Sequence, residues 1–346
     1  MTNAQRHAVF LTGYPDGLPT TDMFEKRSLD MPTPGEGQVL LRTVWMSVDP
    51  YMRGRMNPKV KSYIPPFALD KPLDGGAVSE VVESSVADYA PGDYVVGFSG
   101  GWQDYHVADA SGLQKVDAGL APLSAYLGVL GMPGMTAWSG MSQILKPKEG
   151  ETLFVSGAAG AVGSLVCQLG KLKGMRVIGS AGSPDKCAWL EAEGGCDVAL
   201  NYKDYDNATA LTKALAGAAP KGVDCYFENV GGMHLEAALN CIAFAGRMAL
   251  CGMIAQYNNT KPEPGPSNII NMIGRGVLAQ GFIVSNYMHL SGEFVAEVAP
   301  LLAQEKITFR ESVYEGLDKA GDAFIGLFHG DNFGKAVVRV GPDRLA

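Results

Sequence analysis

The stretch at residues 155–166, "VSGAAGAVGSLV", decides the fold, because three glycines stand between an apolar run and a helix-forming segment. They are Gly157, Gly160 and Gly163, so the second glycine lies one residue later than in the dinucleotide-binding fingerprint G-x-G-x-x-G. We expect a tight turn at the first glycine, a ligand against the backbone at the second, and close packing of helix on sheet at the third. A dinucleotide pyrophosphate would bind at the positive end of that helix; a tight turn without a ligand is the alternative.

Strand-like and helix-like segments alternate from about residue 152 onward. In chain order they are "TLFVSG" (152–157), "AVGSLVCQLGKLKG" (161–174), "RVIGSAG" (176–182), "PDKCAWLEAEG" (184–194), "VALNY" (198–202), "ATALTKALAG" (208–217), "VDCYFENVGG" (223–232), "HLEAALNCI" (234–242), "GRMALCGMI" (246–254) and "VLAQGFIV" (277–284). Alternation at about 25–30 residues per unit predicts an α/β domain with a parallel, doubly wound sheet.

The chain before this region has a different texture. Short β-type runs at 38–48, 75–84 and 93–100 are separated by Pro and Gly turns, which predicts a small, mostly β domain. The segment "NFGKAVVRVG" (332–341) returns to strand character, so we expect it to rejoin this first domain. The expected boundaries are 1–125 plus 310–346 for the β domain and 126–309 for the α/β domain.

Composition limits the possible partners and location. The 346 residues are 47% apolar and 18% charged, enough for two domains with a large core. The net charge is −8, and the nearest basic cluster, Arg53 and Arg55 in "MRGRM", is too small for nucleic acid. No apolar stretch approaches the roughly 18 residues of a membrane span, and Ala8–Leu11 is too short for a signal-peptide core. The six cysteines form no C-x-x-C pair, so we expect them to be reduced in a cytoplasmic protein.

The strand after the glycines indicates which dinucleotide is preferred. NAD sites usually place a carboxylate at the end of this strand, but residues 176–186, "RVIGSAGSPDK", have none before Asp185. Ser183 and Lys186 suit a 2′-phosphate that a carboxylate would repel, so NADPH is expected rather than NADH. The alternative for Ser183 is a helix N-cap, a role that it can combine with phosphate binding. The alternative for Lys186 is an ordinary solvated lysine at the start of a helix.

Metal chemistry is not expected. A catalytic zinc would need Cys and His ligands in the β domain, which has no cysteine and only His7 and His106. The remaining histidines, His234, His289 and His329, are scattered, and we expect surface or packing positions for them.

Without a metal, hydride addition to the β-carbon of an α,β-unsaturated carbonyl is easier than reduction of a simple ketone, because the enolate carries its charge on oxygen. Such a site needs a hydrogen-bond donor for that oxygen and an apolar channel, and tyrosine provides both. The candidates are Tyr51, Tyr63 and Tyr257. Tyr257 follows the fifth expected strand of the α/β domain, at the carboxyl edge where ligands bind. A packing or rim position is the alternative for Tyr51 and Tyr63.

Seven segments together resemble the zinc-free medium-chain dehydrogenase/reductases, in the branch of prostaglandin, alkenal double-bond and bacterial curcumin reductases. They are "SVDPYMRGRM" (47–56), "GMPGMTAW" (131–138), "GAAGAVGSLVCQLGKLKG" (157–174), "ENVGG" (228–232), "CGMIAQYN" (251–258), "GFIV" (281–284) and "GDNFGK" (330–335). The resemblance implies a Rossmann domain with a parallel six-stranded sheet, a GroES-like catalytic domain, NADPH-dependent reduction of enones or enals, and a homodimer.

The resemblance also implies roles for individual residues. For the pyrophosphate these are Ala159, Gly160, Ala161, Val162 and Gly163; for the 2′-phosphate and adenosine, Ser183, Lys186 and Tyr202; along the rest of the cofactor, Asn229, Cys251, Gly252, Ile254, Tyr257, Phe282, Ile283, Val284 and Asn332. Tyr51, Met52, Tyr63 and Tyr257 would face the substrate. Tyr257, together with the nicotinamide ribose hydroxyl, would stabilise the enolate.

Two departures leave the details open. "FEN" at 227–229 replaces the "FDN" of mammalian members, and "GGWQDY" at 100–105 reshapes the expected substrate mouth. The physiological substrate is therefore not predicted. Quinone reduction with NADPH is an alternative activity, and a non-catalytic NADPH-binding protein is an alternative of another class.

Overall fold

The computed structural model describes residues 5–345, which form two compact units. Unit 1 comprises the described residues up to Leu127 and from Glu311 onward, and unit 2 is Gly128–Arg310. The chain thus leaves the first unit, builds the second, and returns to the first.

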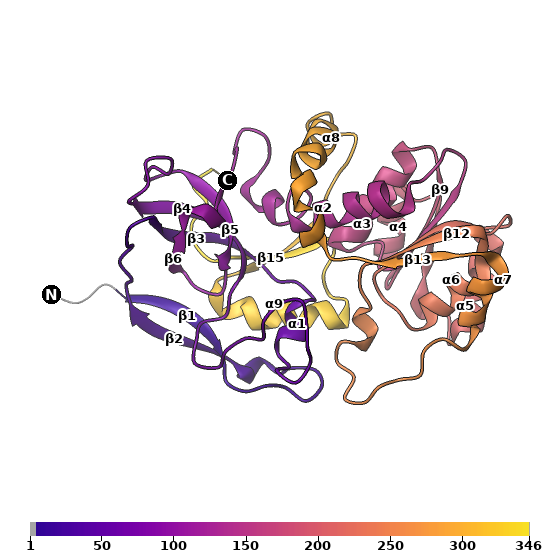
Figure 1. Ribbon diagram of the computed structural model, residues 1–346, viewed down its shortest axis with the longest axis horizontal. Helices are drawn as coiled ribbons and strands as arrows, with labels where there is room; N and C mark the ends of the chain where they lie inside the picture. The colour runs from indigo at the N-terminus through magenta and orange to yellow at the C-terminus, as the bar shows by residue number, and fades with distance from the viewer. Residues whose placement is uncertain (1–4, 346) are drawn as a thin grey trace. The chain divides into compact units, whose positions relative to one another are not determined.

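Unit 2 contains a sheet of six parallel strands in the order β10–β9–β8–β11–β12–β13 (Figure 1). Their bounds are β8 (Thr152–Val155), β9 (Arg176–Ala181), β10 (Val198–Asn201), β11 (Val223–Glu228), β12 (Ile242–Leu250) and β13 (Leu278–Gly281). The strand order reverses beside β8, and in doubly wound sheets this switch point is where dinucleotides bind. The predicted doubly wound parallel sheet is confirmed.

Helices cover both faces of this sheet (Figure 1). The helices are α2 (Met132–Ser139), continued by the π-helical η4 (Gly140–Leu145), α3 (Ala161–Leu172), α4 (Pro184–Ala192), α5 (Ala208–Ala218), α6 (Met233–Cys241), α7 (Asn271–Arg275) and α8 (Ser291–Ala303), with short 3₁₀ turns η5 (Tyr202–Asp204), η6 (Ile254–Gln256), η7 (Ser267–Ile270) and η8 (Val284–Leu290). Leu211 and Leu215 of α5 and Ala237 of α6 are buried against Phe154 and Tyr226 of the sheet. Apolar residues at helical spacing therefore explain why this face is closed.

Unit 1 is built on a seven-stranded sheet in the order β14–β15–β3–β4–β5–β7, with β6 paired to β3, and a separate hairpin β1–β2. The strand bounds are β1 (Gln5–Leu11), β2 (Phe24–Asp30), β3 (Gln38–Ser47), β4 (Gly75–Ser84), β5 (Tyr94–Gly100), β6 (Tyr105–Asp109), β7 (Gln114–Lys115), β14 (Glu311–Glu315) and β15 (Lys335–Arg339). Helical segments are α1 (Met52–Arg55), α9 (Ala320–His329), η1 (Thr21–Met23), η2 (Ala110–Gly112), η3 (Leu123–Leu127) and η9 (Leu317–Lys319). The mostly β character predicted for this part of the chain is confirmed.

The core of unit 1 joins segments far apart in sequence. Trp102 is fully buried and stacks on Phe24 of β2, with ring centroids 5.4 Å apart, and both rings meet Phe324 of α9 edge-on. The apolar run Ala8–Leu11 lies in β1 of the same unit, and all four of its residues are buried. Neither the β1–β2 hairpin nor α9 was expected from the sequence, because their apolar partners lie in other parts of the chain.

The two arginines of "MRGRM" bind the loops of their own unit. Arg53 donates a hydrogen bond to the carbonyl of Gly17 at 2.6 Å. Arg55 forms an ion pair with Asp74, and its guanidinium lies 3.9 Å from the ring centroid of Phe67. Both side chains are buried, so they offer no basic surface patch. No helix within residues 5–345 is long and apolar enough to cross a membrane.

Candidate active site

The glycine loop lies between β8 and α3, at the carboxyl end of the first strand of unit 2. Gly157 has φ of 60°, the left-handed region that other residues avoid. Gly160 is the N-cap of α3, and no side chain caps this helix end. A Cβ on Gly163 would lie 2.3 Å from the carbonyl oxygen of Gly157, so α3 approaches the loop too closely for any side chain there. The N-terminal N–H groups of α3, beside Ala159, Ala161 and Val162, thus remain available for an anion.

Beyond the loop, β9 leads to the residues expected at the adenosine end. Ser183 is the N-cap of α4 and accepts a hydrogen bond from the Lys186 N–H at 3.3 Å. Tyr202 begins η5 after β10, and its hydroxyl lies 2.9 Å from where a Cβ on Gly182 would be. A side chain at position 182 would therefore collide with the Tyr202 side chain. These contacts bring Ser183, Lys186 and Tyr202 into one corner at the carboxyl edge of the sheet.

His234 belongs to the same corner, although the sequence indicated only a surface or packing residue. Its Nε2 lies 3.0 Å from the Ser180 hydroxyl, and its ring meets Tyr202 edge-on with centroids 5.1 Å apart. Burial lowers the pKa of His234 to about 4, so the ring is neutral at physiological pH. His234 supports Tyr202 from behind. The sequence near His234 does not predict these contacts, because its partners lie on β9 and after β10.

Asn229 stands at the end of β11, directly after the buried Glu228. Its Nδ2 donates to the Ser156 carbonyl at 2.7 Å, and its N–H donates to the Ser156 hydroxyl at 2.8 Å. Its Cβ lies near Gly157, 3.5 Å from where a side chain there would start. Asn229 is thus fixed against the glycine loop, and the "FEN" sequence keeps it in place.

The turn after β12 carries Tyr257. Its backbone runs from Cys251 and Gly252 through η6, which begins at Ile254, and the Tyr257 hydroxyl lies 3.0 Å from where a Cβ on Gly252 would be. Burial raises the pKa of Tyr257, so its hydroxyl stays protonated and can donate a hydrogen bond at neutral pH. The turn therefore presents a neutral phenol.

The segment after β13 packs beside the same strands. Phe282 donates its N–H to the Leu250 carbonyl at 3.3 Å and meets Phe227 edge-on at 6.1 Å. Ile283 and Val284 follow at the start of η8. Residues predicted from "ENVGG", "CGMIAQYN" and "GFIV" are thus adjacent within unit 2.

The remaining candidates belong to unit 1. Burial is the main reason why the pKa of Tyr51 is raised, and Tyr63 lies close enough to add to that rise. Met52 is fully buried in the core of unit 1. Tyr63 is 61% exposed. Asn332 donates to the carbonyl of Gly334 at 2.8 Å.

A buried ion pair supports the loop that carries Tyr51. Lys335 of β15 lies 3.3 Å from the Asp49 carboxylate and donates to the Val48 carbonyl at 2.7 Å. Desolvation lowers the pKa of Lys335, an effect that Asp49 opposes. β15, near the end of the chain, therefore holds the segment at residues 47–56 in place.

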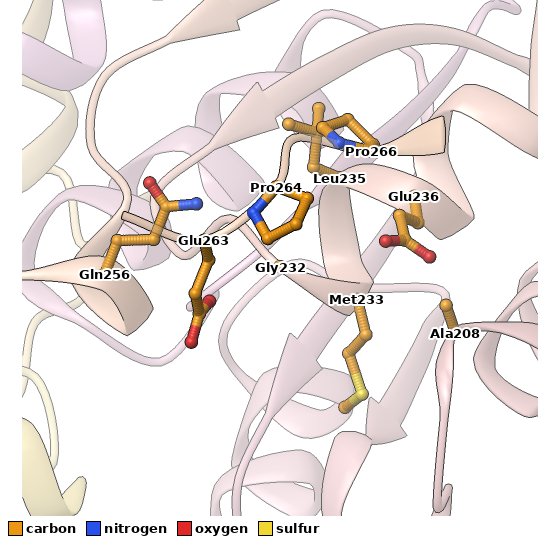
Figure 2. A pocket seen from close by; sticks show the side chains of 9 residues that line it. All are labelled: Ala208, Gly232, Met233, Leu235, Glu236, Gln256, Glu263, Pro264 and Pro266. Carbon is orange, nitrogen blue, oxygen red and sulfur yellow. The ribbon is translucent and has the colours of Figure 1, made fainter. Parts of the chain in front are cut away.

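A pocket of about 290 Å³ opens at the N-terminal ends of α5 and α6 (Figure 2). The lining residues are Ala208, Gly232, Met233, Leu235, Glu236, Gln256, Glu263, Pro264 and Pro266. Two carboxylates border it, which disfavours a phosphate, and none of the predicted site residues lines it. Among residues 5–345, no group of three or more His, Cys, Asp or Glu side chains is placed to hold a metal ion.

Comparisons with known proteins show the family to which the chain belongs. Residues 7–116 match the family described as "N-terminal domain of oxidoreductase", and residues 161–304 match "Zinc-binding dehydrogenase". NADPH-dependent curcumin reductase of Escherichia coli is 45% identical over 338 residues, covering 96% of both chains. The chain belongs to the zinc-free medium-chain dehydrogenase/reductases. Tobacco 2-alkenal reductase, another relative, is 41% identical over 96% of this chain and 95% of its own.

This medium-chain reductase also has a solved structural relative. The crystal structure of CurA in complex with NADPH from Vibrio vulnificus has a TM-score of 0.90 and 41% identity, and the match covers 97% of this chain and 100% of that one. The description of the second family mentions zinc, yet the first cysteine of this chain is Cys167, beyond the whole N-terminal part of unit 1. The predicted zinc-free branch and the predicted two-part fold are confirmed.

Proposed function

We propose that this chain is an NADPH-dependent, metal-free reductase of the carbon–carbon double bond of α,β-unsaturated ketones and aldehydes. The observation that carries the proposal is the protonated, half-buried Tyr257 on a turn at the carboxyl edge of a dinucleotide-binding sheet. The curcumin and 2-alkenal reductases, at 45% and 41% identity over nearly the whole chain, support the same chemistry.

The residues present suit NADPH on physical grounds. The uncapped N-terminus of α3, approached closely because Gly163 has no side chain, fits a pyrophosphate. In our proposal Ala159–Gly163 bind the pyrophosphate, Ser183 and Lys186 the 2′-phosphate, and Tyr202 the adenosine. The other residues that we assign to the cofactor are Asn229, Cys251, Gly252, Ile254, Tyr257, Phe282, Ile283 and Val284 of unit 2 and Asn332 of unit 1.

When bound, NADPH supplies the hydride for the β-carbon of the substrate. The Tyr257 hydroxyl donates a hydrogen bond to the carbonyl oxygen, where negative charge develops as the hydride arrives. A neutral phenol is suited to this role because it keeps its proton at physiological pH. In unit 1 we assign Tyr51 and Tyr63 to the substrate. Met52, which the resemblance also assigns to the substrate, is fully buried in the core against which Tyr51 packs, so we leave it out of the substrate site. Water or Tyr257 provides the proton for the α-carbon.

The proposal includes a cytoplasmic homodimer. β13 is an edge strand of the sheet in unit 2, and Leu278 on it is exposed. Phe244 and Ile273, on the neighbouring β12 and α7, are 81% and 83% exposed. Edge strands beside exposed apolar side chains commonly pair across a two-fold axis. All six cysteines are free, which fits a reducing compartment.

The test is a comparison of substrates and cofactors. We expect NADPH oxidation, followed by absorbance, with a panel of aryl and alkyl enones, and much slower turnover with NADH. A quinone that is reduced far faster than every enone would overturn the proposal in favour of quinone reduction. NADPH binding without turnover of any enone or quinone would instead indicate a non-catalytic protein.

A further inference from the structure

Glu228 is a buried carboxylate that the proposed mechanism does not use. It ends β11 and is completely buried. Its Oε1 accepts three hydrogen bonds, from the Ser156 hydroxyl at 2.7 Å, the Val230 N–H at 2.7 Å and the Gly231 N–H at 2.8 Å. One oxygen therefore joins the end of β8, directly before the glycine loop, to the turn that follows β11.

The turn after β11 is itself hydrogen-bonded to the segment that carries Tyr257. Cys251 and Gly252 both donate their N–H groups to the Glu228 carbonyl, at 3.0 and 3.1 Å. Ile254 donates to the Asn229 carbonyl at 3.2 Å, and Ala255 donates to the Val230 carbonyl at 3.0 Å. Four backbone hydrogen bonds thus align the two turns, and Tyr257 lies two residues beyond the last donor.

Packing leaves these two turns little freedom to separate or slide. Gly231 has φ of 80°, and a Cβ on it would lie 3.1 Å from the Met253 side chain. In this conformation the Gly231 N–H donates its hydrogen bond to Glu228 Oε1. Removal of the carboxylate would leave the Val230 and Gly231 N–H groups without their acceptor in a buried turn.

We propose that Glu228 is a positioning residue that sets the location of the Tyr257 hydroxyl through the paired turns at 228–231 and 251–255. The inference rests on the proposed function, because it gives Glu228 a role in catalysis only through Tyr257. What the site requires of residue 228 is a hydrogen-bond acceptor at Oε1, because all three of its partners are donors.

Three variants separate acceptor geometry from charge. Glu228→Gln keeps a carbonyl oxygen that can accept all three hydrogen bonds, so kcat should stay within about threefold of wild type. Glu228→Ala removes the acceptor, and a donor misplaced by about 1 Å should lower kcat roughly 10- to 100-fold with a smaller change in KM. Ser156→Ala is the milder change, expected to lower kcat about 2- to 10-fold, and it serves if Glu228→Ala does not fold.

Each variant is then combined with Tyr257→Phe. If Glu228 acts through Tyr257, the double variants should be no slower than Tyr257→Phe alone. Multiplicative losses would overturn the proposal, and so would a loss in Glu228→Gln as large as that in Glu228→Ala. A Tyr257→Phe enzyme as fast as wild type would refute both this inference and the assignment of Tyr257 as donor.

Amide hydrogen exchange supplies a readout that does not depend on activity. In Glu228→Ala and Ser156→Ala, exchange across residues 251–257 should become faster than in wild type, whereas Glu228→Gln should retain the wild-type rates. Unchanged exchange in the folded acceptor-loss variants would overturn the inference even if the enzyme reduces enones. Faster exchange in a protein that reduces no enone would refute the proposed function while leaving the coupling of the two turns intact.

Discussion

Replacement of Gly163 by alanine tests whether close approach of α3 to the glycine loop builds the site. The new Cβ would lie 2.3 Å from the Gly157 carbonyl oxygen and 2.8 Å from the Ala158 Cα. Contacts below 3.0 Å do not persist, so backbone must move by at least 3.0 − 2.3 = 0.7 Å. Overpacking of this kind costs about 2–3 kcal/mol, and alanine returns about 1 kcal/mol of helix propensity. The net loss should be about 1–2 kcal/mol.

In a unit of this size such a loss lowers the melting temperature by about 2–8 °C. The same backbone movement should weaken NADPH binding at least about tenfold, because hydrogen bonds from the N-terminus of α3 to the pyrophosphate lengthen. Thermal unfolding without NADPH, followed by circular dichroism, and titration of NADPH fluorescence measure the two effects separately.

Gly217 of α5 is the matched control, because a Cβ there would meet nothing within 4 Å. Gly217→Ala should raise the melting temperature by about 1–4 °C through helix propensity and leave the affinity for NADPH unchanged. The reasoning is refuted if the two variants melt within 1 °C of each other, or if Gly163→Ala binds NADPH as tightly as wild type.

Three further predictions concern other parts of the chain. Lys186→Ala should weaken NADPH binding about 10- to 100-fold and NADH binding by less than about twofold, because only NADPH carries the 2′-phosphate; equal losses in the two titrations would contradict the assignment. Burial lowers the pKa of His106 and His234 to about 4, so between about pH 6.5 and pH 4 the unfolded chain binds protons that the folded chain does not. The free energy of unfolding should therefore decrease as the pH is lowered through this range, by up to about 3 kcal/mol per histidine. Urea unfolding at several pH values checks this, and His234→Gln should reduce the slope; a slope unchanged by that variant would argue against the buried neutral ring. Ile273→Asp should convert the proposed homodimer to a monomer in light scattering, whereas Val60→Asp, at an exposed position of unit 1, should not. A dimer that survives the first change does not use this surface.

The sequence predicted those elements whose signal is local. Strand-like runs that alternate with helix-like segments predicted the parallel, doubly wound sheet, and the glycine spacing predicted a tight turn between a strand and a helix. The order of the strands was not predicted. The position of Tyr257 at the carboxyl edge followed from the same count of strands, whereas that of Asn229 came from the resemblance.

Features that depend on distant partners could not be predicted in this way. His234 contacts Ser180, 54 residues earlier, and Glu228 accepts from Ser156, 72 residues earlier. His234 has no neighbour in sequence that marks it, and the segment "ENVGG" marks Glu228 without indicating Ser156 as its partner. Met52 shows the same difficulty on a smaller scale, because it is fully buried although Tyr51 beside it is not.

The place of β15 between β14 and β3 has a consequence for how the protein is made. Unit 2 ends at Arg310, so it can fold as soon as that residue has left the ribosome. The sheet of unit 1 lacks an internal strand until Arg339 has emerged, although most of that unit is translated first. The usual order of folding, N-terminal unit first, is thus reversed, because the sheet of unit 1 is completed only by the last part of the chain. A nascent chain interrupted after residue 310 would carry a complete dinucleotide-binding unit beside an unfinished β domain.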